Sequence, residues 1–195
     1  MKNEDSEYKI IDAGAKYTIF ISIPNADVNK TSEKIYEFIK SSKKPLCRYL
    51  QRFVPISNTC KAFNEDIEKC VEQLFNNIYN SSETIKYTCI FKSSNNSTLK
   101  REDIIKIVNT YFQTKNSQNK VDYDQPDFVI LVQVIRNICF ISYLKEYFVY
   151  RKYNLVEMGI KYSKESGDIK QEIEKTDVNN ENSEKALEPL EESKE

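Results

Sequence analysis

The stretch DFVILVQVIRNICFISYL (127–144) decides the fold, because two apolar segments flank the polar pair Arg136–Asn137. A short polar pair between two strand-length apolar segments is typical of a β-hairpin, which we therefore predict here. Gln133 and the polar pair also interrupt the stretch. It therefore lacks the run of about 18 apolar residues that a membrane-spanning helix needs, and we expect no membrane partner.

Strand-like and helix-like patterns alternate upstream of this hairpin. Alternating apolar residues, or apolar runs bounded by turn signals, predict strands at 17–24, 47–56 and 85–92. Apolar residues at helical spacing predict helices at 31–45, 63–78 and 101–112. Three strand-helix units followed by paired strands predict an α/β fold, with helices packed on a mixed sheet.

Composition excludes several kinds of active site. The chain has no histidine, which excludes a Ser-His-Asp triad, a Cys-His dyad and every zinc site that uses imidazole. Its three glycines lie far apart, so neither a P-loop nor a dinucleotide fingerprint is present. We therefore expect no cofactor, no metal, no catalytic residue and no enzymatic activity.

The cysteines point to a reducing compartment. The five cysteines are dispersed, and none forms a CxxC pair. The N-terminal residues MKNEDSEYK are charged, and no apolar run follows them as it does in a signal peptide. We therefore expect reduced thiols and an intracellular protein.

Charge is distributed unevenly along the chain. Residues 40–152 carry 18 Lys/Arg and 11 Asp/Glu, a net charge of +7, whereas residues 161–195 carry 6 and 11, a net charge of −5. A basic globular region with an acidic tail suits a polyanion-binding domain, and an ordinary solvated surface is the alternative. The tail is too polar to offset its chain entropy by burial, so disorder is predicted for 161–195 and also for residues 1–16.

A polar corner lies in RFVPISNTCKAF (52–63), which is predicted as a strand followed by a helix start near Lys61. Four interpretations stay open for it. Cys60 could be a nucleophile, since a helix N-terminus lowers the pKa of a thiol, or part of a metal site. The corner could be a plain helix start capped by Ser57 or Thr59. It could also hold a phosphate at the helix N-terminus, an interpretation that Lys61 and Arg52 favour.

A second basic corner, FKSSNNSTLKRED (91–103), repeats this arrangement. Lys92 ends a predicted strand, an Asn/Ser turn follows, and Lys100 and Arg101 begin a predicted helix. Loops at the carboxyl ends of parallel strands gather along one edge of a sheet, so we predict that both corners flank one groove. The alternative is that SSNNST is only a turn.

Four segments, in this order and spacing, resemble the THUMP domain of the eukaryotic tRNA-acetylation adaptors, the family of THUMP domain-containing protein 1 and its yeast counterpart Tan. They are RFVPISNTCKAF, KSSNNSTLKREDII, NKVDYDQPDFVILVQVI and VYRKYNL. The resemblance covers residues 47–155 as a THUMP domain. It extends more loosely to 17–46, a strand-helix element that corresponds to a reduced ferredoxin-like part.

This resemblance implies a THUMP-like fold and a non-catalytic protein that binds tRNA. It further implies that the protein presents serine and leucine acceptor tRNAs to an RNA cytidine acetyltransferase, which forms acetylcytidine in the D-arm. A nuclear or nucleolar location is implied as well, with the cytoplasm as the alternative. Relatives commonly carry a basic residue where this chain has Ser94, which implies a weaker phosphate grip at the second corner.

The residues and the resemblance together predict a set of basic and polar RNA-binding side chains. They are Arg48, Arg52, Thr59, Lys61, Lys92, Asn95, Asn96, Lys100, Arg101, Arg151 and Lys152. The alternative function is a protein-docking module that acts through its acidic tail and does not bind RNA directly.

Overall fold

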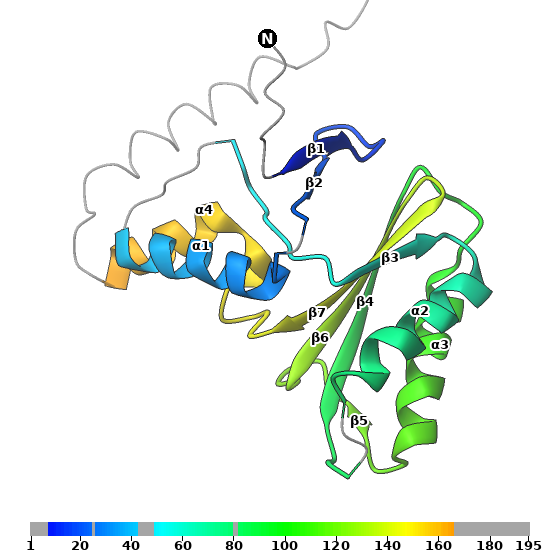
Figure 1. The fold of residues 1–195 in the computed structure, drawn as a ribbon. Helices are drawn as coiled ribbons and strands as arrows, with labels where there is room; N and C mark the ends of the chain where they lie inside the picture. Colours follow the sequence, from blue (N-terminus) through cyan, green and yellow to red (C-terminus); the bar gives the residue numbers. More distant parts are fainter. Residues whose placement is uncertain (1–7, 25, 43–48, 80–81, 166–195) are drawn as a thin grey trace, which may run out of the picture.

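A computed structural model describes residues 8–24, 26–42, 49–79 and 82–165 of the chain. Its centre is a five-stranded sheet with the strand order β3-β7-β6-β4-β5. Helices α2 and α3 cover one face of this sheet, and α1 and α4 lie side by side toward one end (Figure 1). The strands β1 and β2 form a separate two-stranded sheet.

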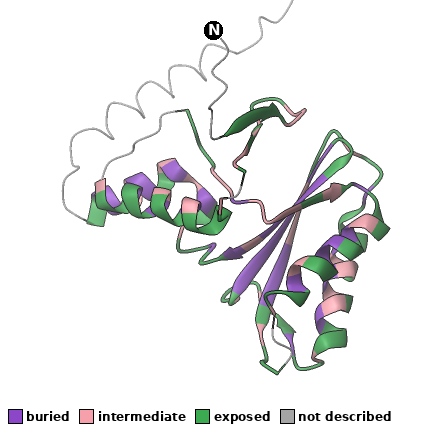
Figure 2. Ribbon diagram, viewed as in Figure 1, coloured by how far each residue is buried: buried purple, intermediate pink, exposed green. Residues whose placement is uncertain are grey.

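The predicted central hairpin is confirmed. β6 (Phe128–Ile135) and β7 (Ile138–Lys145) pair antiparallel, and Arg136 adopts a left-handed conformation in the tight turn between them. β4 (Lys86–Ser94) runs parallel to β6 and to the short β5 (Lys120–Val121), and β3 (Asn58–Lys61) pairs antiparallel with β7. The sheet is therefore mixed, as predicted, and its inner strands are mostly buried (Figure 2).

The first face of the sheet carries the larger core. Helices α2 (Asn64–Asn76) and α3 (Arg101–Lys115) occupy the two segments with helical spacing and confirm those predictions with shifted ends. Their buried side chains, Phe75 and Phe112 among them, pack on Tyr87 and Ile130 of the strands. Both aromatic residues of the helices are fully buried, so this face is closed to solvent at its centre.

The second face carries a smaller core that ends in a helix where the sequence predicted disorder. Helices α1 (Val28–Ser42) and α4 (Leu155–Glu165) and a short turn, η1 (Arg151–Tyr153), pack on the inner strands. The prediction of disorder from residue 161 is wrong as far as 165, because Leu155, Met158 and Tyr162 repeat at helical spacing and are buried. Residues 166–195 lie outside the described part of the chain.

The N-terminal prediction also needs correction. β1 (Lys9–Asp12) pairs antiparallel with β2 (Ile19–Ser22), so part of the segment predicted to be disordered is a strand. Phe20 of β2 packs on Phe140 of β7 with 5.5 Å between the ring centroids. The hairpin is therefore joined to the second face of the sheet.

The predicted strand over 47–56 is wrong. From residue 49 onward the segment is extended, but its only ladder contact within the described range is the isolated bridge between Arg52 and Asn154. Pro55 has no backbone donor for a ladder, and the chain enters the sheet only at β3, three residues later. Phe53 and Val54 instead pack against the second core.

Candidate nucleic-acid interface

The first polar corner, within residues 52–63, is a strand end and not a helix start. Thr59 and Lys61 belong to β3, whereas α2 begins at Asn64 with Phe63 as its N-cap and no side-chain capping bond. The predicted caps are therefore wrong, and the Ser57 hydroxyl instead accepts a hydrogen bond from the Tyr143 backbone N–H at 3.1 Å. Lys61 precedes the helix by three residues, so it does not oppose the helix dipole in the first turn.

Cys60 does not have the environment of a nucleophile. It faces Cys139 across the β3–β7 ladder, and a hydrogen bond with the Cys139 side chain raises the pKa of Cys60 to about 12. The sequence predicted a lowered pKa, which a helix N-terminus would have caused, but Cys60 lies in a strand. Among the residues that the structure places, no group of cysteine, aspartate and glutamate side chains is arranged to hold a metal ion.

The register of the sheet brings three of the predicted residues to its second face. Lys92 of β4 lies opposite Gln133, Gln133 opposite Phe140, and Phe140 opposite Thr59, so these four side chains form a row across one face. The next row along the strands runs from Ser94 through Ile135 and Ile138 to Lys61. Three strand spacings of about 4.8 Å separate Lys92 from Thr59 by about 14 Å.

Two further cations approach Lys92 from outside the sheet. Phe53 N–H donates to the Tyr153 carbonyl at 3.2 Å, and Leu155 N–H donates to the Gln51 carbonyl at 2.8 Å, which fixes Arg52 opposite Asn154 and close to η1. Burial of the half-buried Lys92 side chain and the nearby charges of Arg52 and Lys152 lower the pKa of Lys92. We call Arg52, Lys92 and Lys152 the cation cluster.

The cation cluster lacks acidic partners. No ion pair involves Arg52, Lys92 or Lys152 in the parts of the chain that the structure describes. Three positive charges held together without a carboxylate repel one another, and an anion between them removes this repulsion. The arrangement therefore suits a phosphate group, for which Arg and Lys are the usual protein partners.

A left-handed backbone segment holds one member of this cluster. Arg151, Lys152 and Tyr153 have φ values of 50°, 57° and 61°, and none of them is a glycine. Such residues cost about 1 kcal/mol each in this conformation. Burial of Tyr153, its hydroxyl donating to the Lys145 carbonyl at 2.8 Å, and the Lys152 N–H donating to the Tyr147 carbonyl at 2.8 Å stabilise the segment.

The second predicted corner is divided between the two faces of the sheet. Lys100 is the N-cap of α3 and Arg101 its first residue, as predicted. Arg101 lies close enough to Cys89 to oppose the burial that raises the pKa of this thiol to about 12. Cys89 packs in the first core, and strand alternation places Lys92 on the opposite face. Lys92 thus groups with Arg52 and Lys152, and not with Arg101 in the predicted single groove.

The asparagines of this corner have structural contacts. Asn96 Oδ1 accepts the backbone N–H groups of Thr98 and Leu99, both at 3.1 Å, and Asn96 Nδ2 donates to the Arg136 carbonyl at 2.6 Å. Asn95 Nδ2 donates to the Gly14 carbonyl at 3.2 Å. These contacts are those of a turn that joins three loops. Arg48, also predicted to bind RNA, lies outside the described residues.

Sequence reasoning missed Gln133 and Phe140, which lie between Lys92 and Thr59 on the second face. The apolar appearance of both strands concealed them. Once the central hairpin is assumed, alternation along β6 and β7 assigns them to one face, but the pairing of β4 and β3 with this hairpin requires the structure.

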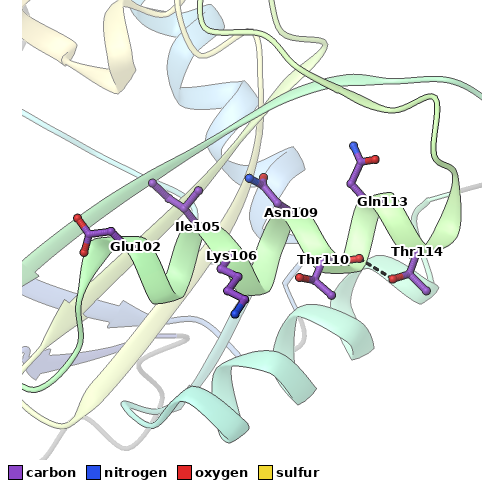
Figure 3. A pocket seen from close by; sticks show the side chains of 7 residues that line it. All are labelled: Glu102, Ile105, Lys106, Asn109, Thr110, Gln113 and Thr114. Carbon is purple, nitrogen blue, oxygen red and sulfur yellow. Dashed lines mark hydrogen bonds between the residues drawn. The ribbon is translucent and has the colours of Figure 1, made fainter.

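A shallow depression along α3 is separate from the cation cluster. Its lining side chains project outward from this helix alone and do not converge on a common point (Figure 3). They are Glu102, Ile105, Lys106, Asn109, Thr110, Gln113 and Thr114. Because one helix cannot enclose a ligand, the depression does not have the form of a binding pocket.

The raised thiol pKa predicts slow alkylation. Since the pKa of Cys60 is raised to about 12 in the folded state, against about 8.5 for a free cysteine, its thiolate is scarce at about pH 8. We expect Cys60 in the native protein to react with iodoacetamide about a thousand-fold more slowly than free cysteine. Peptide mass mapping of the alkylated protein over time measures this rate.

The raised pKa of Cys60 also predicts in which direction stability changes with pH. The protonated Cys60 thiol stabilises the fold fully below its unfolded pKa of about 8.5, and this contribution is lost as the pH rises toward the folded value. As the pH rises above about 9, the urea midpoint of the wild type should therefore fall more than that of a Cys60→Ala variant. Alkylation of native Cys60 at the rate of the urea-unfolded chain would contradict the proposed environment.

The left-handed turn predicts an unusual stabilising substitution. Lys152→Gly removes the Cβ that disfavours the φ of 57°, so we expect the free energy of unfolding to rise by up to about 1 kcal/mol. Lys152→Met removes the same charge but keeps the strain, and it should not share this gain. The measurement is urea unfolding of both variants, and destabilisation by Lys152→Gly alone would show that the turn is not strained.

Comparison with known proteins agrees with this architecture. Residues 61–144, from the end of β3 to β7, match the THUMP domain family. THUMP domain-containing protein 1 of Mus musculus is 33% identical over 159 residues, which are 82% of this chain and 45% of the relative. The Homo sapiens protein is 33% identical over 151 residues, 77% of this chain and 43% of the relative. The chain thus spans less than half the length of these curated relatives.

A solution structure of the THUMP domain of THUMP domain-containing protein 1 is 31% identical in sequence to this chain. The match covers 46% of this chain and 91% of that chain, and its TM-score is 0.39. The names of these relatives describe a domain and no catalytic activity. The family match and the relatives both indicate a THUMP domain, and the relatives are identical to this chain at about one position in three over most of its length. The chain therefore belongs to the THUMP domain proteins and is related to THUMP domain-containing protein 1.

Proposed function

We propose that this chain is a non-catalytic RNA-binding adaptor that holds tRNA through the second face of its sheet. The cation cluster is the observation that carries the proposal, because it gathers three unpaired positive charges from three separate segments of the chain. Family membership supports it, since the resemblance in sequence is to adaptors of tRNA acetylation. The RNA partner is a tRNA, with serine and leucine acceptors as the specific candidates.

The row beside the cluster supports an RNA ligand over a small anion. Gln133 offers a donor and an acceptor, the exposed Thr59 a hydroxyl, and the exposed Lys61 a further charge beyond it. Phe20 of the β1–β2 hairpin packs on the buried Phe140 in the middle of this row. Lys92 on one side of the hairpin and Thr59 on the other therefore offer two contact points about 14 Å apart, a span of more than one phosphate of an RNA backbone. Arg151, which is exposed and precedes Lys152 in the left-handed turn, adds a further positive charge to this segment.

The absence of histidine and the raised thiol pKa values support an adaptor over an enzyme. In this proposal, an RNA cytidine acetyltransferase supplies the chemistry, and this chain supplies tRNA affinity. The product is acetylcytidine in the D-arm, and the nucleus or nucleolus is the proposed location. Within the described residues, no helix has the length and apolarity to cross a bilayer.

The cation cluster predicts the salt dependence of tRNA binding. Each phosphate contact that is lost flattens the slope of log affinity against log salt concentration by about 0.9 on duplex DNA, and we apply this value to RNA. The double variant Arg52→Met/Lys92→Met should flatten the slope by up to about two units while keeping the apolar stems of both side chains. Fluorescence titration of labelled tRNA at several salt concentrations measures it.

A matched double variant controls for the loss of two positive charges. Lys69 of α2 and Lys106 of α3 are exposed on the helices that cover the other face. Lys69→Met/Lys106→Met should keep the wild-type slope. Equal slopes for the two double variants would rule out the cluster as the tRNA site. No tRNA binding by the wild type at low salt would favour the protein-docking alternative.

Reconstitution tests the adaptor role separately from RNA affinity. We expect purified protein with tRNA and an acetyl donor to form no acetylcytidine, and addition of the acetyltransferase to form it faster than the acetyltransferase alone. Arg52→Met/Lys92→Met should lose this stimulation. Mass spectrometry of tRNA nucleosides measures the product, and acetylcytidine formed by this chain alone would overturn the adaptor assignment.

A further inference from the structure

A second concave site lies between α1, the end of β7 and η1, apart from the row on the sheet. It is a cavity of about 380 Å³, a size within the range of ligand pockets. Four tyrosines line it, namely Tyr36, Tyr143, Tyr150 and Tyr153, together with the acidic residues Glu33 and Glu146 and one cation, Lys145.

The tyrosine rings are fixed in place. Tyr36 packs against Tyr150 and Tyr153 with ring centroids 5.0 Å and 5.1 Å apart, and Tyr150 lies 5.7 Å from Tyr153. Tyr36 Oη donates to the Phe53 carbonyl at 2.7 Å, and Tyr153 Oη donates to the Lys145 carbonyl at 2.8 Å. Both hydroxyls are thus satisfied within the chain, and the half-buried Tyr150 lines the cavity. Tyr143 also lines it, while its ring packs on Phe128 of the larger core.

The charge of this site is opposite to that of the cation cluster. Burial and a contact with Glu146, followed by the charges of Glu37 and Glu33, raise the pKa of Tyr150 to about 12. Two lysines of α1 are engaged with other carboxylates, since Lys30 pairs with Asp27 and Lys40 pairs with Glu37. Glu33 and Glu146 make no ion pair with any other described residue.

We propose that this tyrosine pocket binds the ammonium group of a lysine side chain, methylated or not, on a partner protein. Aromatic faces attract a cation through their quadrupole, and carboxylates at the rim add charge complementarity. Lys145 Nζ lies 5.9 Å from the centroid of the Tyr143 ring, so one cation of the chain already lies beside an aromatic residue that lines this cavity. A negative pocket repels RNA, so the partner is a protein with an exposed basic segment.

Titration of the full-length protein with short peptides tests this inference, and it does not depend on the proposed RNA-binding function. The probes are a five-residue peptide with one central lysine, the same peptide ε-trimethylated, and the same peptide ε-acetylated. We expect NMR-detected binding of the two cationic peptides and none of the neutral acetylated one. Equal binding of all three peptides, or no binding of any, would overturn the proposal.

Substitutions locate the binding. Tyr150→Leu should weaken it about five-fold, which corresponds to about 1 kcal/mol for one cation–π contact. Tyr150→Phe keeps the ring and should keep the affinity, which separates loss of the ring from misfolding. Glu146→Gln should also weaken binding, whereas Lys145→Met should strengthen it, because the competing internal cation is removed.

Two controls complete the design. Tyr123→Leu changes a tyrosine that is 65% exposed and lies outside the pocket, so it should leave binding unchanged. Spermidine provides the other cationic source, and tighter binding of spermidine than of the lysine peptides would overturn the assignment to a protein partner. The salt dependence of tRNA binding should stay at the wild-type value in all pocket variants, so failure here is distinguishable from failure of the RNA proposal.

Discussion

The β6–β7 hairpin is the constraint on which the rest of the structure depends. Its strands are buried on both faces, so alternate residues of one strand enter different cores. Val129 and Leu131 pack with α1 and α4, whereas Ile130 and Val132 pack with α2 and α3. A register shift of one residue would exchange these two sets and place Gln133 in the larger core. The position of the polar row on the second face is therefore a consequence of how this hairpin packs.

The left-handed turn after β7 links this scaffold to both candidate sites. Tyr150 and Tyr153 line the tyrosine pocket, and Lys152 between them belongs to the cation cluster. A right-handed helical turn would distribute these neighbouring side chains differently around its axis. The strain of three non-glycine residues at positive φ is consistent with a segment whose side-chain directions matter more than its intrinsic stability. The turn therefore contributes residues both to the proposed anion site and to the proposed cation pocket.

Much of the fold could be predicted from residue patterns, and the errors have identifiable causes. The hairpin around Arg136 and helix α3 have strong local signals, and both are confirmed. The segment RFVPI (52–56) has the apolar content of a strand, but Pro55 and the contacts of Phe53 with the second core keep it out of the sheet. The helix α4 was missed because its short apolar face lies beside the highly charged tail and gains its stability from packing.

The candidate site was harder to predict than the fold, because it depends on which faces the side chains share. Two basic corners at the ends of neighbouring strands suggested one groove, yet Arg101 lies beside Cys89 in the first core and Lys92 belongs to the second face. Conversely, Arg52 and Lys152 are far apart in the sequence and meet through the bridge to Asn154. Pairing between distant segments decides such groupings, and a single sequence contains no direct signal for it.

Lys92 is the residue through which the fold bears most directly on the proposed anion site. A half-buried lysine loses hydration, and two like charges nearby oppose its protonation further, so its pKa is lowered. Both effects act against the free protein, and in the proposed complex a phosphate would reverse both, because it would replace the lost hydration and screen Arg52 and Lys152 from Lys92. Part of the proposed affinity for an anion would then come from relief of this repulsion. The acidic tyrosine pocket carries the opposite charge, so the two proposals call for two different kinds of partner.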